Sequence, residues 1–290
     1  MKRALLLLFS FLIIYPLRGQ KLDEFFVQST AYISYLIKKD NKMWSSSGTG
    51  FLVFIEKNTI THTGRMYLVT NKHVLPKSSE SKTITVKVPF ETEKDTTFIE
   101  FNVDIYNKDS TLNSFVKFHK NKNTDVAAID ITAIVLYKNL RISSIPSQLL
   151  LRKSDYKKHK IGLGDEVFII GYPSSIYDKR SVMPIVRQGI ISSNPYKEFY
   201  FNNAFMDKDS TLPNPLDGFL VDGSIFPGSS GSLVLLKAAT EIDLEFTVSR
   251  ESPFVLGIIS KNFNNNKDQS IGLGLVFSSE CIWEVLNEFK

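Results

Sequence analysis

The chain has 290 residues, of which 43% are hydrophobic and 22% are charged, and its formal net charge is +5. This composition is ordinary for a folded soluble protein and excludes a chain that is disordered over most of its length. The lysines are scattered, and the sequence has neither zinc-finger spacing nor a glycine-rich phosphate loop, so nucleic acid is not an expected partner.

The first residues have the pattern of a leader. Lys2 and Arg3 precede an almost unbroken apolar run over 4–17. As a helix this run spans about 21 Å, which is shorter than a hydrocarbon core of about 30 Å. The pattern predicts a secretory signal peptide at residues 1–19, with a small residue, Gly19, for cleavage but a poorly fitting Leu17. An uncleaved membrane anchor is the alternative.

A single cysteine, Cys281, excludes an intrachain disulfide. An exported protein of this size must then be stabilised by its core, which favours a secreted or periplasmic protein of a bacterial envelope. After removal of the leader, no stable membrane association is expected. Cys281 lies in a predicted C-terminal helix at about 278–289, where the thiol is expected to be a small buried apolar group.

Short strand-like segments dominate the chain after the leader. They are rich in β-branched and aromatic residues and are separated by polar turns. Before a linker near 140–165 they are 29–37, 49–55, 65–74, 82–88, 97–106 and 125–135; after it they are 165–173, 186–193, 231–236, 246–250, 254–260 and 272–277. This pattern predicts an all-β sandwich or pair of barrels, with long surface loops at 107–124, 195–220 and 262–270.

One short turn, FPGSSGS (226–232), places glycine and serine between two apolar runs. Pro227 has a fixed φ and no N–H, and Gly228 can adopt backbone angles that other residues avoid. If the turn folds back tightly, the N–H groups of Gly228 and Ser230 point at one spot, as in an oxyanion hole. Most small-residue turns between strands have no chemistry, so the meaning of this one depends on a base and an acid elsewhere.

His73 is the candidate base. It follows the apolar strand MYLVT at a point where the chain turns, and a histidine held at a strand end is well placed to accept a proton. A structural histidine that caps a turn is the alternative. The other histidines lie in polar sequence and are expected at the surface: His62, His119 and His159.

Asp125 is the candidate acid because it opens the apolar segment DVAAIDI. A carboxylate at the mouth of such a strand is partly buried and can accept the Nδ1 proton of a histidine. Asp130, five residues later, falls inside the strand, where alternation favours a solvent-facing side chain. We therefore prefer Asp125.

The chain resembles the chymotrypsin-fold serine proteases, most closely the bacterial HtrA/Deg-like, trypsin-like peptidases. The resemblance lies in the order His73, Asp125, Ser230 and in the sequence motifs around these residues. The matching segments, in chain order, are SSGTGFLV (46–53), TNKHV (70–74), DVAAI (125–129), GDEVFIIGYP (164–173), QGIISS (188–193), the nucleophile segment VDGSIFPGSSGS (221–232), and the closing strands VLGIIS (255–260) and GLGLVF (272–277). The resemblance covers roughly 29–288. Each motif alone is weak evidence for the family, and the resemblance rests on the order and spacing of all of them.

The resemblance implies one peptidase domain over 20–290, built from two six-stranded antiparallel β-barrels at about 29–140 and about 160–277, with the helix at about 278–289. It implies that Ser230 attacks the scissile carbonyl, His73 transfers the proton and Asp125 orients the histidine. The N–H groups of Gly228 and Ser230 would form the oxyanion hole. The substrate would be a protein or peptide, and neither a metal nor an organic cofactor is implied.

Specificity is less defined. The residues expected to form the walls of the substrate pocket are Ser224, Ile225, Phe226, Ile259 and Ser260. Since Ser224 is small and uncharged at the position that matches the pocket floor, a preference for small or apolar side chains is the hypothesis.

The chain also departs from the family pattern. Ser229 and Ser232 replace an asparagine and a glycine, Phe226 stands where a polar residue is common, and no PDZ domain is expected. A catalytically idle or gated binding module of the same fold is therefore the second hypothesis. A structural β protein in which FPGSSGS is only a turn is the third.

Overall fold

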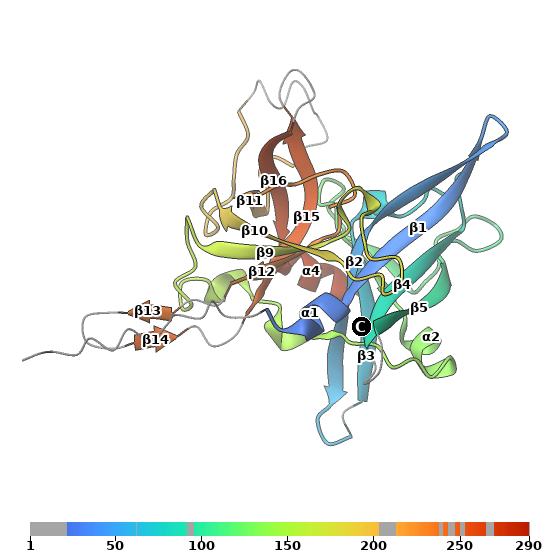
Figure 1. Ribbon diagram of the computed structural model, residues 1–290, viewed down its shortest axis with the longest axis horizontal. Coiled ribbons are helices and arrows are strands. Elements are labelled where there is room, and N and C mark those ends of the chain that lie inside the picture. The colour runs from blue at the N-terminus through green and yellow to red at the C-terminus, as the bar shows by residue number, and fades with distance from the viewer. Residues whose placement is uncertain are drawn as a thin grey trace, which may run out of the picture.

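The computed structural model describes residues 22–61, 63–91, 96–202, 213–237, 240–242, 247–249, 253–264 and 270–289. The predicted signal peptide, residues 1–19, and His62 lie outside the described residues. Strands dominate the described chain and form two bodies, one from each half of the sequence (Figure 1).

The first body is an eight-stranded sheet. Seven strands follow the antiparallel order β5-β4-β1-β2-β3-β7-β6, and β8 pairs with β2 in parallel. The bounds are β1 Thr30–Lys39, β2 Lys42–Asn58, β3 Thr63–Thr70, β4 Thr83–Glu91, β5 Thr96–Asp104, β6 Val116–Phe118, β7 Ala127–Asp130 and β8 Ile145–Pro146. In β4, Ile84, Val86 and Val88 are fully buried on one face, as the two-residue period of a half-buried strand requires.

The second body is a closed barrel of six strands in the order β10-β11-β16-β15-β12-β9. A separate hairpin, β13–β14, projects from it (Figure 1). The bounds are β9 Glu166–Gly171, β10 Ile185–Ile191, β11 Gly218–Asp222, β12 Leu233–Leu236, β13 Thr240–Ile242, β14 Thr247–Ser249, β15 Val255–Asn264 and β16 Ser270–Ser278. The expected chymotrypsin-like, mostly β fold with a C-terminal helix is thereby confirmed.

The first body differs from the expected six-stranded barrel. It has eight strands, and its path does not close through a ladder between β5 and β6. The reason lies in β6, which has only three residues, and in the polar turn before it, where Tyr106 and Leu112 form an isolated bridge. The segments on either side of this turn are joined instead by isolated hydrogen bonds, such as those from the Asn113 N–H to the Ile105 carbonyl (3.0 Å) and from the Asn113 side-chain amide to the Asp104 carbonyl (2.6 Å).

Helices are few and short. They are α1 Glu24–Gln28, α2 Thr132–Tyr137, α4 Ser279–Leu286 and the 3-10 turns η1 Lys72–Val74, η2 Ser147–Leu149, η3 Lys153–Asp155, η4 Pro173–Ser175 and η5 Asn287–Phe289. The strand expected over 125–135 is therefore wrong in its second half, which is α2. The Asp130 carboxylate accepts a hydrogen bond from the Thr132 N–H (3.0 Å) and so favours a helix start over continued pairing. The short α1 was not expected.

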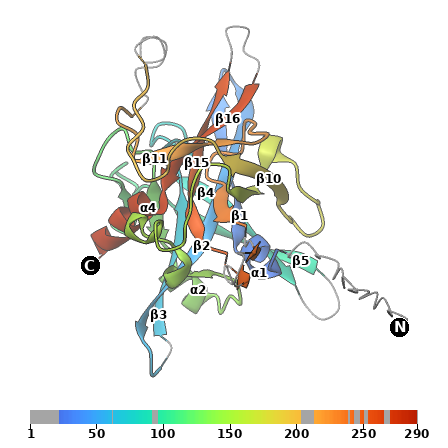
Figure 2. The ribbon, with the colours of Figure 1, turned by 90° about the vertical axis from the view of Figure 1, so that its left-hand side faces the viewer.

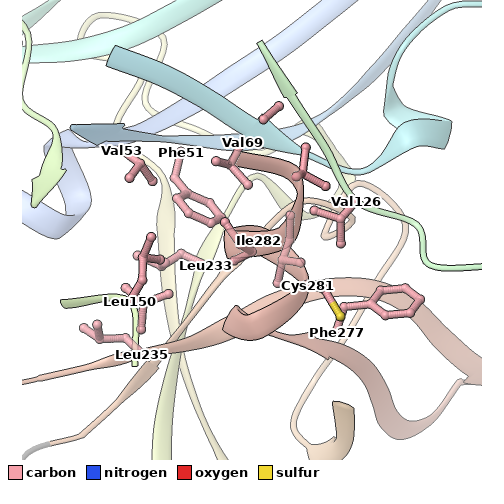
Figure 3. Packing of buried hydrophobic residues seen from close by; sticks show 14 of the residues in the cluster. Phe51, Val53, Val69, Val126, Leu150, Leu233, Leu235, Phe277, Cys281 and Ile282 are labelled. Carbon is pink, nitrogen blue, oxygen red and sulfur yellow. The ribbon is translucent and has the colours of Figure 1, made fainter. Parts of the chain in front are cut away.

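Helix α4 packs against strands of both bodies, as the close-up shows (Figure 3), and the turned view shows it beside the C-terminus (Figure 2). Its buried Cys281 and Ile282 lie in one cluster with side chains from both halves of the chain. These include Phe51, Val53, Val69 and Val126 from the first half, and Leu233, Leu235 and Phe277 from the second. The expected burial of Cys281 is borne out, and desolvation raises the pKa of its thiol.

The polar face of α4 covers His119, so the expected surface position of this histidine is wrong. His119 was expected at the surface, but its side chain is only 9% exposed and its Nε2 lies 2.5 Å from Oε2 of Glu284 in α4. One turn earlier on the same face of the helix, Arg152 Nη1 lies 2.5 Å from Glu280 Oε1, and the Arg152 guanidinium lies 4.4 Å from the Trp283 ring centroid. The helix thus makes polar contacts with the first body, through His119, and with the segment that joins the two bodies, through Arg152.

Candidate active site

His73 lies in η1, directly after strand β3 ends, and one carboxylate holds it at two points. The Nδ1 atom of His73 is 2.5 Å from Oδ2 of Asp125, and the His73 backbone N–H donates to Oδ1 at 3.2 Å. The His73 side chain is 49% exposed. With Nδ1 directed at a carboxylate, Nε2 is the ring atom left to exchange a proton with a substrate or a nucleophile.

Asp125 precedes β7 and is held from three directions. Its carboxylate also accepts a hydrogen bond from the Ser260 hydroxyl (2.6 Å), and its backbone carbonyl accepts one from the Asn71 side-chain amide (2.6 Å). Burial alone would raise the pKa of Asp125, but the hydrogen bond and charge of His73, with the hydrogen bond from Ser260, outweigh it and leave the pKa lowered. The group therefore stays an anion and keeps the imidazole oriented.

Ser230 lies in the turn between β11 and β12 and is joined to Asp125 through Ser260. The Ser230 hydroxyl donates to the Ser260 carbonyl (2.9 Å), and the Ser260 hydroxyl donates to Asp125. Ser260 therefore contacts Ser230 with its backbone carbonyl and Asp125 with its side-chain hydroxyl, and it holds the two residues near each other. Within the described part of the chain, however, the Ser230 hydroxyl makes no hydrogen bond to the His73 ring.

The peptide group between Pro227 and Gly228 has a fixed direction. Its carbonyl accepts a hydrogen bond from the Ser174 N–H (2.6 Å), and in a trans peptide the N–H points the opposite way. Gly228 has φ +84°, and Ser174 and Ser175 in η4 have φ values of 50° and 57°. Over the residues that the structure describes, the N–H groups of Gly228 and Ser230 have no acceptor, so both remain available to a ligand.

Thr49, in the middle of β2, fastens the Ser230 turn to the first body. Its N–H donates to the Ser230 carbonyl (2.9 Å) and its hydroxyl donates to the Gly228 carbonyl (3.1 Å). The hydroxyl also accepts from the Tyr172 N–H (3.0 Å). Thr49 is fully buried, so these bonds are not exchanged with solvent.

Gly231 is required for this close approach. It has φ +86°, and a Cβ at this position would lie 1.8 Å from the Thr49 carbonyl oxygen. Thr70 donates to the same oxygen (2.7 Å). Strands β2 and β3 therefore supply the surface against which the Ser230 turn is seated.

The five residues expected to line the substrate pocket fall into two groups. Ser224 and Phe226 are exposed, whereas Ile225, Ile259 and Ser260 are at most 2% exposed. Ile225 and Ile259 belong to the core of the second barrel, and Ser260 contacts Asp125 and Ser230.

Arg187 of β10 was not among the sequence candidates. Its guanidinium donates to the Ser224 carbonyl and lies 4.6 Å from the Phe226 ring centroid.

The sequence analysis also did not identify Thr49 and Ser174 as residues that hold the Ser230 turn. It placed Ser260 in the wall of the substrate pocket and did not identify its contacts with Asp125 and Ser230. A signal for two of them exists. Thr49 and Ser260 are single hydroxyl residues inside apolar strand words, GTGFLV and LGIIS, and a buried hydroxyl needs a hydrogen-bond partner. The position of Ser174 depends on a backbone N–H, for which the sequence has no marker.

Neither a metal site nor a membrane-spanning helix is found in the described ranges. They contain no group of three or more histidine, cysteine, aspartate or glutamate side chains placed to hold a metal ion. No helix in the same ranges is long and apolar enough to cross a bilayer.

Comparison with known proteins gives one family match. Residues 48–240 match the model of the trypsin-like peptidase domain. Among solved structures, the crystal structure of the Rv3671c protease in its inactive form matches with a TM-score of 0.46 and 15% sequence identity, over 91% of this chain and 89% of that chain. A search of curated proteins gave no match.

Proposed function

Because the chain belongs to the trypsin-like peptidase domain family, we propose that it is an exported serine endopeptidase with Ser230 as nucleophile, His73 as general base and Asp125 as the orienting acid. The family implies protein or peptide substrates. The observation that carries the proposal is the pairing of His73 with Asp125, whose carboxylate contacts both the ring and the backbone N–H of the histidine.

The first chemical step is attack on the scissile carbonyl carbon. The Ser230 hydroxyl exchanges the Ser260 carbonyl for Nε2 of His73 by rotation of its side chain, and His73 takes the proton as the Oγ–C bond forms. Catalytic hydrogen bonds are often long or misaligned before substrate binds, so the observed contact to Ser260 is compatible with this step. His73 then delivers the proton to the leaving amine, and water hydrolyses the acyl-enzyme by the same route.

The oxyanion that forms during attack is stabilised by the N–H groups of Gly228 and Ser230. Two features support this role: both groups lack an acceptor in the described chain, and the Ser174 N–H holds the Pro227 carbonyl so that the Gly228 N–H points away from it. Preorganised donors of this kind contribute about 3–4 kcal/mol each to transition-state stabilisation.

Asp125 stabilises the charged imidazole during the proton transfer. Its lowered pKa supports an anionic carboxylate, and its contacts to both the ring and the backbone of His73 support a fixed ring orientation. Loss of the charge while the shape is kept typically costs such an enzyme about 10⁴ in kcat. The expected consequence is that Asp125→Asn is folded but nearly inactive.

Export is the second part of the proposal. It is supported by the basic start at Lys2 and Arg3 and the apolar run over 4–17. Expression with the native leader and N-terminal sequencing of the exported product should give a start near residue 20. A product that keeps the apolar run would instead support the membrane anchor.

A gated binding module remains the second candidate, because the Ser230 hydroxyl donates to the Ser260 carbonyl and not to the His73 ring. Hydrolysis of internally quenched peptide pools separates the two. We expect activity in the wild type, its loss in Ser230→Ala and His73→Ala, and no change in Ser154→Ala, which removes an exposed hydroxyl from η3. A folded wild-type protein with no activity above that of Ser230→Ala would favour the binding module.

A further inference from the structure

A cavity of about 750 Å³ borders His73 and Asp125 on the side of the first body. Its apolar wall consists of the side chains of Tyr35, Leu75, Pro76, Tyr106 and Phe118. A space of this size is ample for an amino-acid side chain. Because His73, the proposed general base, is one of its lining residues, an occupant would lie within about two residues of the bond that is cut.

The charged residues of this cavity are mostly lysines: Lys72, Lys77, Lys122 and Lys261. The two carboxylates that face the same space already have partners. Asp125 is bound to His73 and Ser260, and Glu80 accepts a hydrogen bond from the Lys77 backbone N–H (3.0 Å).

Three of these lysines have no carboxylate partner within ion-pair distance in the described chain, namely Lys72, Lys77 and Lys122. The ammonium group of Lys72 donates to the Asn121 carbonyl (2.8 Å). Burial lowers the pKa of Lys72, and the charge of Asp125 offsets this only in part. A partly desolvated cation whose neighbouring carboxylate is already bound to His73 is a cost that an incoming anion relieves.

We propose that this cavity is the subsite for an acidic side chain of the substrate, an aspartate or glutamate within two residues of the scissile bond. The inference rests on the proposed endopeptidase function and adds a substrate class to it. The apolar wall accommodates the methylene groups of the side chain, and the lysines bind its carboxylate. Complementary charge of this kind contributes to selectivity through both encounter and binding.

The expected size of the preference follows from the exposure of the lysines. An exposed ion pair contributes about 0.2–1 kcal/mol, which is up to about fivefold in a binding constant. Two or three such contacts, one of them partly desolvated, give a preference of roughly tenfold in kcat/KM for glutamate over glutamine. High salt should reduce this preference, because the Debye length falls from about 8 Å at 0.15 M to about 3 Å at 1 M.

Cleavage profiling with a proteome-derived peptide library tests the subsite. The wild type should enrich aspartate and glutamate at one position within two residues of the cut, and Lys122→Glu should abolish the enrichment or turn it towards lysine. Lys77→Glu should act in the same direction. Lys138→Glu, which alters an exposed lysine outside this cavity, should leave the wild-type profile unchanged.

Two results would overturn the inference while the endopeptidase proposal stands. One is cleavage by the wild type without acidic enrichment near the cut. The other is an enrichment that persists unchanged in both Lys122→Glu and Lys77→Glu. If the folded wild type cleaves no peptide, the endopeptidase proposal fails and the subsite fails with it.

Discussion

The buried hydroxyl of Thr49 gives the sharpest test of how the first body supports the Ser230 turn. Thr49→Val keeps the shape of the side chain but removes the donor to the Gly228 carbonyl and the acceptor for the Tyr172 N–H. Each buried group left without a partner costs about 1–3 kcal/mol, and the added methyl group returns about 0.8 kcal/mol. We expect a loss of about 1–5 kcal/mol in the free energy of unfolding.

Activity should fall as well, because the Gly228 carbonyl belongs to the turn that carries both proposed oxyanion donors. Loss of one such donor lowers kcat by about 10²–10³, which sets the upper limit for the effect of a loosened turn. The matched control is Thr49→Ser, which keeps the hydroxyl and loses one methyl group at a cost of about 0.8 kcal/mol. It should retain most of the activity.

Urea unfolding followed by fluorescence, together with kcat and KM on one peptide substrate, measures both effects. The valine variant should lose stability and kcat, with a smaller change in KM, and the serine variant should recover both quantities. Equal stability and equal kcat in the two variants would refute the view that the Thr49 hydroxyl positions the Ser230 turn.

Three further variants and one thiol measurement test other parts of the structure. Gly231→Ala should prevent seating of the turn, since its Cβ would lie 1.8 Å from the Thr49 carbonyl oxygen at φ +86°; thermal unfolding should show a large loss, and a wild-type midpoint would contradict the close approach. Ile282→Ala should cost about 2–5 kcal/mol in urea unfolding, because Ile282 is fully buried between the two bodies; a loss below 1 kcal/mol would argue against the packing of α4. Since the pKa of Asp125 is lowered, its stabilisation is present above the unfolded pKa of about 3.9 and is lost as pH falls through the lowered folded pKa. The stability of Asp125→Asn should therefore fall less than that of the wild type between about pH 4 and pH 2, and parallel curves would count against the pairing. Cys281 should react with a thiol reagent only after denaturation, because it is fully buried; fast native labelling would show that α4 is not docked.

Local sequence patterns predicted where the candidate triad residues lie in the fold better than they predicted the contacts that hold these residues. The positions of His73 and Asp125 at strand ends and of Ser230 in a glycine-rich turn are visible in short words, because each depends on the nearest few residues. The structure brings His73 and Asp125 into direct contact. It links Ser230 to them only through Ser260, because the Ser230 hydroxyl donates to the Ser260 carbonyl. The side-chain rotamer that makes this contact cannot be predicted from the sequence.

Contacts between distant segments explain most of what the sequence did not predict. Thr49 and Gly228 meet across the two bodies, and nothing near either residue predicts the other. His119 is in polar sequence, yet α4 covers it through Glu284. In the segment after β7, apolar residues continued the strand pattern, but the Asp130 carboxylate starts a helix at Thr132. In each case a tertiary or capping contact outweighed the local pattern.

The central claim is that Ser230 is an activated nucleophile, and labelling of the purified protein with a fluorophosphonate probe tests it most directly. Intact mass spectrometry should show one adduct in the wild type, peptide mapping should place it on Ser230, and Ser230→Ala should not react. His73→Ala should react far more slowly while remaining folded. A folded wild-type protein that stays unlabelled, or an adduct on another residue, would contradict the account.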